Sequence, residues 1–216
     1  MHRRTSGGPM RAVSRVAGAV VVVAGVVACS ISTGNGNKGG GPTTILNERF
    51  SSGTLSNWVI VLGAPTISAS VGDPAPSAFL SNSDMKTAFT TTMANGLTIT
   101  SDILVDSGSA SFRLVQPGSP IAVAHVFRDS AVYVICTASD CPFTTLQFAE
   151  DANWHEYRFV YDAGTSTGQW LRDGANQFSL TNVPALTTVF LKAGMFSKDT
   201  AGPSGGFYDN VVVTIP

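Results

Sequence analysis

The sequence predicts an all-β domain built as a two-sheet antiparallel jelly-roll sandwich, preceded by a signal peptide and a flexible linker. From residue 44 onward the chain is rich in Thr, Ser, Val, Phe and Gly and poor in Lys, Glu and Leu, which is the composition of strands and turns. Apolar and polar residues alternate with a period of two in about a dozen short segments. No long segment has helical periodicity, and no repeat of roughly 20–50 residues indicates a propeller or a solenoid.

The N-terminal leader is basic at first and then apolar. Arg3, Arg4, Arg11 and Arg15 precede an uncharged apolar stretch, residues 16–28, and no acidic residue occurs among them. This stretch is shorter than the roughly 20 residues that a membrane-spanning helix needs. A basic start, a short apolar region and a small-residue exit are typical of a secretory signal peptide. Either Met1 or Met10 can be the start of translation.

The residues at the end of the apolar stretch resemble the bacterial lipobox. Residues 26–29 read Val-Val-Ala-Cys, and this resemblance implies that Cys29 is lipidated and becomes the first residue of the mature chain. Each buried acyl CH₂ contributes roughly 0.8 kcal/mol, so two or three chains hold a protein firmly on a membrane. We therefore expect an exported, membrane-anchored lipoprotein on the outer membrane or cell surface, facing the periplasm or the exterior. The type of cell envelope stays open.

The expected domain organisation has three parts. Residues 1–28 form the signal peptide, residues 29–43 the lipidated cysteine and a glycine-rich linker, and residues 44–216 the folded domain. The linker is rich in Gly, Ser, Thr and Asn, so it cannot bury enough apolar surface to fold.

The charge of the mature chain differs from that of the full sequence. The leader contains four of the 13 basic residues and none of the 14 acidic ones, so its removal changes the formal net charge from −1 to −5. Proteins that bind nucleic acid carry basic patches, so we expect no nucleic-acid partner.

Two cysteines remain besides Cys29. Cys136 and Cys141 flank the turn-like residues Thr-Ala-Ser-Asp between two predicted strands, so they face each other across a hairpin. An exported chain meets an oxidising compartment, which favours a disulfide. The alternative, a metal site, lacks a histidine or second cysteine pair nearby to complete it.

Three segments resemble concanavalin A-like jelly rolls of the laminin-G and glucanase-like kind. They are the opening segment ILNERFSSGTLSNWVI, the central segment NWHEYRFVYDAGTSTGQWLRDG and the closing segment GGFYDNVVVTIP. The resemblance spans roughly residues 45–216. It implies a concave sheet or rim loops that contact a ligand, often a glycan. It also implies a structural calcium ion held by Asp209 with an acid of the first strand, here Glu48, since calcium prefers carboxylate and carbonyl oxygens. The alternative for Asp209 is a capped turn.

The alternation within the central segment predicts its two faces. Tyr157, Phe159 and Tyr161 share one face, which should be core, while Arg158 lies on the other. Asp173-Gly174 is typical of a tight hairpin turn.

The sequence does not predict a familiar catalytic centre. A retaining glycosidase needs two carboxyl groups about 5–5.5 Å apart, and Glu150 and Asp151 are adjacent residues that would point in opposite directions. No Gly-x-Ser-x-Gly motif occurs. His125 shares a strand face with apolar residues, so we interpret it as a packed core histidine. These observations predict that the protein is not an enzyme.

Binding is the function that the sequence favours. The candidate ligand-binding residues are those expected to point outward opposite an apolar face: Asp102, Arg113, Arg158, Trp170 and Arg172. Guanidinium and indole groups suit the hydroxyls and the apolar ring face of a sugar. We therefore expect a lipid-anchored extracytoplasmic domain that binds carbohydrate or another cell-surface polymer. The alternatives are a glycoside hydrolase-like enzyme with an unusual acid pair that includes Glu156, and a structural or adhesive surface domain.

Overall fold

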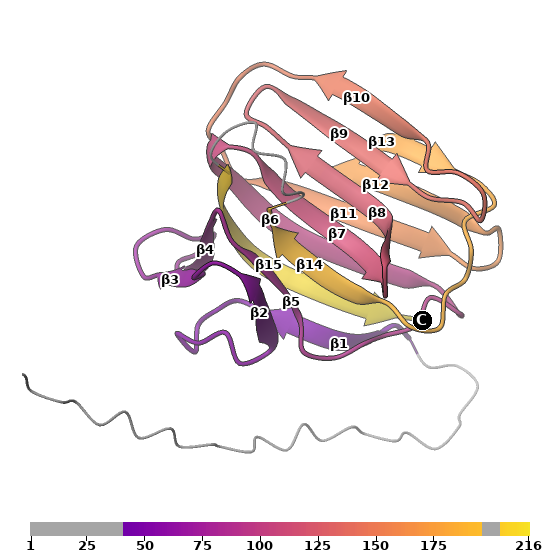
Figure 1. The fold of residues 1–216 in the computed structure, drawn as a ribbon, viewed down its shortest axis with the longest axis horizontal. Helices are drawn as coiled ribbons and strands as arrows, with labels where there is room; N and C mark the ends of the chain where they lie inside the picture. The colour runs from indigo at the N-terminus through magenta and orange to yellow at the C-terminus, as the bar shows by residue number, and fades with distance from the viewer. Residues whose placement is uncertain (1–40, 196–203) are drawn as a thin grey trace, which may run out of the picture. The chain divides into compact units, whose positions relative to one another are not determined.

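The computed structural model describes residues 41–195 and 204–216, and its secondary structure there consists of fifteen β-strands (Figure 1). The predicted signal peptide, Cys29 and nearly all of the predicted linker lie outside the described residues. Among the described residues, no helix is long and apolar enough to cross a membrane.

The strands form two antiparallel sheets, stacked one behind the other in Figure 1. Sheet A has the order β13-β12-β11-β6-β15-β4-β3, with β1 also paired to β15, and sheet B has the order β10-β9-β8-β7-β14-β5-β2. The strands of sheet A are β1 (Thr43–Glu48), β3 (Thr66–Ser68), β4 (Ser77–Ser81), β6 (Leu97–Gly108), β11 (His155–Asp162), β12 (Thr167–Arg172), β13 (Ala175–Leu180) and β15 (Ser204–Ile215). Those of sheet B are β2 (Trp58–Leu62), β5 (Asp84–Thr87), β7 (Ala110–Gln116), β8 (Ser119–Val126), β9 (Ser130–Ile135), β10 (Phe143–Gln147) and β14 (Phe190–Gly194). The predicted jelly-roll sandwich is therefore confirmed.

The core lies between the sheets and is filled by every second residue of their strands. Trp170 is fully buried at its centre and contacts the rings of Phe112, Tyr133 and Phe159 from both sheets. The indole Nε1 donates a hydrogen bond of 3.1 Å to the carbonyl of Val134, so its polar atom is satisfied inside the core. The aromatic cluster thus fixes sheet A against β9 of sheet B.

The central segment folds as its alternation predicts. Tyr157, Phe159 and Tyr161 of β11 are buried, at 2%, 0% and 3% exposure. Asp173 and Gly174 form the β12–β13 turn with positive φ values of 51° and 77°, as the hairpin dipeptide predicts.

The hydroxyl group of Tyr208 joins the two sheets. Tyr208 lies on β15 of sheet A, and its oxygen accepts hydrogen bonds from the backbone N–H groups of Ser111 (3.0 Å) and Gly194 (3.2 Å) in sheet B. The same hydroxyl donates to the carbonyl of Ser111 at 3.1 Å. Burial raises the pKa of Tyr208 far above its ordinary value, so this group stays neutral.

Candidate functional site

The outer face of sheet B, which points away from the core, is enclosed at its centre. Ser111, Arg113, Val123 and Asp84 point to this face from β7, β8 and β5, and each is at most 5% exposed. Side chains on the outer face of a sandwich become this buried when the sheet curves around them or flanking loops cover them. The centre of the outer face of sheet B is therefore closely packed, and its polar side chains are largely shielded from solvent.

Three charged residues meet at that centre. Asp84 on β5 accepts a hydrogen bond from Arg113 Nη2 on β7 at 2.5 Å, and its second oxygen lies 2.5 Å from Lys192 Nζ on β14. Burial lowers the pKa of Arg113, an effect that the charge of Asp84 opposes. Each oxygen of Asp84 therefore contacts a different cation, and the cluster retains one positive charge. Lys86, next to Lys192 across the β5–β14 pair, places its amino group 4.9 Å from the centre of the Phe190 ring and adds a further cation.

His125 lies on the same face, directly opposite Ser111 on the neighbouring strand. Its ring meets Phe127 edge-on, with centroids 4.7 Å apart. Burial lowers the pKa of His125, and the charge of Arg113 lowers it further, so the imidazole is neutral at pH 7. The prediction of a core histidine is wrong, because the alternating residues Ala122, Ala124 and Val126 supply the core face of β8 around His125.

The two sheets carry opposite charge. The strands of sheet B contain Lys86, Arg113 and Lys192 against a single acid, Asp84. The strands of sheet A contain six acids and two arginines. The described strands of sheet B therefore carry a net positive charge, whereas those of sheet A carry a net negative charge.

The predicted ligand-binding residues do not form one site. Arg113 belongs to the basic centre of sheet B. Asp102 and Arg158 lie on the outer face of sheet A, where Asp102 accepts a hydrogen bond of 2.7 Å from Asn210 Nδ2 and Arg158 pairs with Glu156. Sequence reasoning missed Asp84 and Lys192. Lys192 is conspicuous in the sequence because it lies between the apolar residues of the segment FLKAG. The neighbouring sequence does not indicate that its partner is Asp84.

Trp170 and Arg172 do not point outward, contrary to the prediction. Trp170 is fully buried, because the inner face of β12 needs a large apolar side chain to fill the space between the sheets. Arg172 points to the same side at the end of β12, where its guanidinium lies 4.2 Å from the Phe148 ring and 3.7 Å from Asp151.

The two predicted calcium ligands have separate partners. Glu48 accepts hydrogen bonds of 2.8 Å from the backbone of Phe50 and from Asn57 Nδ2. Asp209 accepts from the backbone N–H groups of Asp73 (2.8 Å) and Asn210 (2.7 Å), as in a capped turn. No group of three or more ligating side chains suited to a metal ion occurs among residues 41–195 and 204–216. The described side chains therefore do not fit the expected site, and calcium binding stays a prediction.

Another acid cluster lies near Asp209. The pKa values of Asp102 and Asp209 are both raised, first by burial and then by the charge of other carboxylates, including Asp73. The acids that interact with Asp209 are therefore Asp73 and Asp102.

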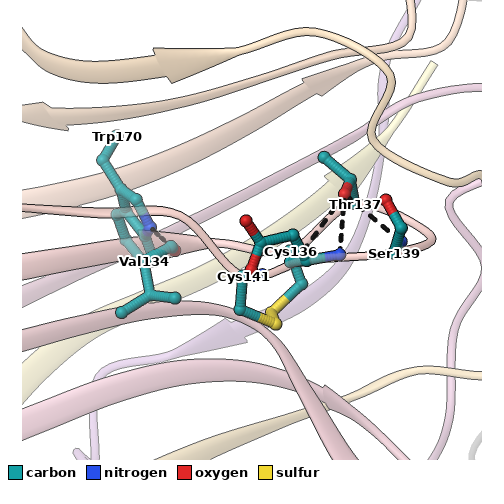
Figure 2. Close-up of a disulfide and its surroundings, with 7 residues drawn as sticks. Val134, Cys136, Thr137, Ser139, Cys141 and Trp170 are labelled. Atoms are coloured by element: carbon teal, nitrogen blue, oxygen red, sulfur yellow. Dashed lines mark hydrogen bonds between the residues drawn. A yellow bond between two sulfur atoms is a disulfide. The ribbon is translucent and has the colours of Figure 1, made fainter.

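The predicted disulfide is present. Cys136 and Cys141 are bonded at the β9–β10 connection, as Figure 2 shows. Within this turn, Thr137 N donates to the carbonyl of Asp140 at 2.7 Å, and Thr137 Oγ1 accepts from the backbone N–H of Asp140 at 3.1 Å. The hairpin is thus held by a covalent bond and by its own backbone hydrogen bonds.

Solved structures share this fold at low sequence identity. A Bacillus licheniformis β-glucanase matches 83% of this chain and 100% of its own, with 17% identity and a TM-score of 0.55. Domain 4 of the Geobacillus stearothermophilus arabinanase AbnA, a structure with arabinotriose, matches 81% of this chain and 93% of its own, with 13% identity and a TM-score of 0.58. The polysaccharide lyase family 7 alginate lyase AlgAT5 matches 75% and 95%, with 8% identity and a TM-score of 0.57. The chain also matches a sialidase, but over only 18% of that longer protein. The chain matches no protein-family model and no curated protein sequence.

These matches contradict the prediction that the protein is not an enzyme. The β-glucanase and the alginate lyase are enzymes that match the fold over nearly their full length. At such low identities the likeness shows the fold alone. The fold is therefore compatible with catalysis, but the matches do not identify a reaction. The described domain therefore shares the two-sheet jelly-roll fold of β-glucanases and of the arabinanase domain.

Proposed function

We propose that the protein binds an acidic polysaccharide across the outer face of sheet B and cleaves it by β-elimination. The observation that carries this proposal is the cluster of Arg113, Lys192 and Asp84 beside the neutral imidazole of His125. The alginate lyase with the same fold acts, by its name, on one such polymer and lends support.

The cations supply the binding step. A sugar carboxylate pairs well with a guanidinium, which offers two parallel donors, and with a lysine amino group. Asp84 fixes both Arg113 and Lys192 from a buried position, so their charged groups are oriented before the ligand arrives. Their charge also offsets the negative charge that develops on the carboxylate when the neighbouring carbon loses its proton.

The neutral imidazole supplies the chemical step. His125 takes the proton from the carbon that bears the carboxylate, and the electron pair of that bond forms a double bond to the adjacent carbon. The bond from that adjacent carbon to the glycosidic oxygen breaks. The imidazolium then returns its proton to the departing oxygen. A histidine with a lowered pKa is suited to this work, because it is in the base form at neutral pH.

Hydrolysis has less support on this face. Asp84 is the only acid in the described strands of sheet B, and both of its oxygens contact cations. A retaining or inverting hydrolase needs two carboxyl groups, one of which donates a proton. The geometry therefore favours elimination over hydrolysis.

The test is a panel of acidic and neutral polysaccharides incubated with the full chain. Elimination creates a conjugated double bond that absorbs ultraviolet light, together with a new reducing end, whereas hydrolysis creates the reducing end alone. We expect ultraviolet absorbance to rise with polyuronates and not with neutral glucan or arabinan. His125→Asn should abolish the rise while polymer binding persists, and His155→Asn, which changes the other histidine of the domain, should leave it unchanged. Reducing ends without absorbance, or activity on neutral polymers alone, would contradict the proposal.

The proposed location is the membrane surface. Lipidation at Cys29 predicts that the mature chain fractionates with membranes and that Cys29→Ser releases it into the soluble fraction. An anchored acidic domain would approach a polyanion through the cations of sheet B.

A further inference from the structure

Phe143 is the most exposed large apolar side chain among the described residues. It is 68% exposed and is the first residue of β10, the edge strand of sheet B. The remaining well-exposed large apolar side chains all lie on β2, at the opposite edge of the same sheet. A ligand that packs on this exposed ring removes apolar surface from water, which favours binding.

Strand register places Phe143 in line with the basic centre. Phe143 pairs with Val134, Val134 with Val123, and Val123 with Arg113, so the four residues form one row across β10, β9, β8 and β7. Residues paired in this way point to the same face of a sheet. Strands lie about 4.8 Å apart, so three spacings separate Phe143 from Arg113 by roughly 14 Å. The ring and the cations therefore share one face and one line.

The hairpin that carries Phe143 is held in place on two sides. The disulfide between Cys136 and Cys141 closes the turn two residues before Phe143 (Figure 2). On the paired strand, the carbonyl of Val134 accepts the hydrogen bond from Trp170 in the core. A ring on a fixed hairpin loses little conformational entropy when a ligand packs on it.

We propose that Phe143 is a distal sugar-binding subsite, on which a ring of the same acidic glycan packs while its carboxylate-bearing unit lies at Arg113 and Lys192. This inference rests on the proposed function for the position of the reacting unit. The apolar C–H face of a sugar packs on an aromatic ring, and strand pairing places Phe143 and Arg113 in one row perpendicular to the strands. Only a glycan long enough to span both positions gains from Phe143. The site therefore selects polymers over short oligosaccharides.

The experiment compares wild type, Phe143→Ala and Phe143→Trp as full chains. The substrates are a disaccharide, short oligosaccharides and the polymer of one polyuronate. We expect Phe143→Ala to lower kcat/KM about tenfold for the polymer and to leave the value for the shortest cleaved oligosaccharide unchanged. Phe143→Trp should retain the polymer value. Ile60→Ala is the matched control, because Ile60 is 51% exposed at the opposite edge. An equal loss at every length, or no loss at any length, overturns the inference.

A binding measurement separates this inference from the proposed reaction. In affinity electrophoresis through gels that contain the polyuronate, Phe143→Ala should migrate faster than wild type, and Phe143→Trp should not. Retardation that depends on Phe143 supports the subsite even where no variant shows elimination. Equal retardation of wild type and Phe143→Ala overturns the subsite even where elimination is observed.

Discussion

The replacement Asp84→Asn tests the charge arrangement at the centre of sheet B. Asp84 is 5% exposed, and its oxygens contact Arg113 and Lys192 at 2.5 Å each. Asparagine has nearly the same shape but no charge. The variant therefore leaves two cations side by side, one of them a guanidinium whose side chain is 6% exposed.

The expected cost follows from those contacts. A hydrogen bond to a charged group contributes about 1.5–3 kcal/mol. Breaking a buried ion pair from one side costs about 3–5 kcal/mol, because the remaining charge stays buried without compensation. We therefore expect Asp84→Asn to lower the free energy of unfolding by about 3–5 kcal/mol. For a domain of this size the melting temperature should fall by roughly 6–20 °C.

Urea unfolding followed by tryptophan fluorescence measures this loss. The matched control is Asp106→Asn, since Asp106 is an exposed acid on β6 and its replacement should change the free energy by no more than about 0.5 kcal/mol. Replacing the pair as Asp84→Asn with Arg113→Met should recover part of the loss, because the buried guanidinium is then removed. A loss below about 1 kcal/mol for Asp84→Asn, with an unchanged m-value, would refute the arrangement.

Three further predictions concern groups elsewhere in the domain. Tyr208→Phe should lower the free energy of unfolding by about 1–3 kcal/mol in urea, because two buried N–H groups lose their acceptor; an unchanged value would contradict the inter-sheet contact. The pKa of His125 is lowered in the folded state, so its contribution to stability is full above its unfolded pKa of about 6.5 and is lost as pH falls through the folded value. Wild type should accordingly lose stability below about pH 6.5 more steeply than His125→Gln, and parallel pH profiles would rule this out. Burial and, after it, neighbouring carboxylates raise the pKa values of Asp102 and Asp209. If the calcium ion that the family resemblance implies binds there, it should raise the melting temperature of wild type but not of Asp209→Asn; equal melting temperatures in calcium and chelator would count against a site.

Much of the sandwich could be predicted because strand patterning is local. The alternation of Tyr157, Phe159 and Tyr161 identifies a buried face without knowledge of the partner strand, and all three are buried. The Cys136–Cys141 bridge was predictable for the same reason, since both residues belong to one hairpin. The short strands β4 and β13 could not be predicted in this way, because their alternation between apolar and polar residues is weak.

The faces of β7 and β8 could not be assigned from the pattern. Arg113 alternates with apolar residues as expected. It points to the outer face of sheet B but is buried there, so it is not the exposed side chain that the alternation predicts. On β8, Val123 lies on the same side as His125, whereas the core residues between and beside them include Ala122 and Ala124. Side-chain size therefore indicated the wrong face as core and concealed the histidine of the candidate site.

The sequence by itself determined the fold class, the hairpins and the disulfide, because these depend on neighbours within one or two strands. It also predicts export and a lipid anchor at Cys29. Only the tertiary structure decided which strands lie side by side, and with that order it assembled the charged site. Asp84, Arg113 and Lys192 come from β5, β7 and β14, which are distant in the chain and adjacent in sheet B. The period of two specifies a face, but register and strand order decide which residues share it, and those depend on packing across the whole sandwich.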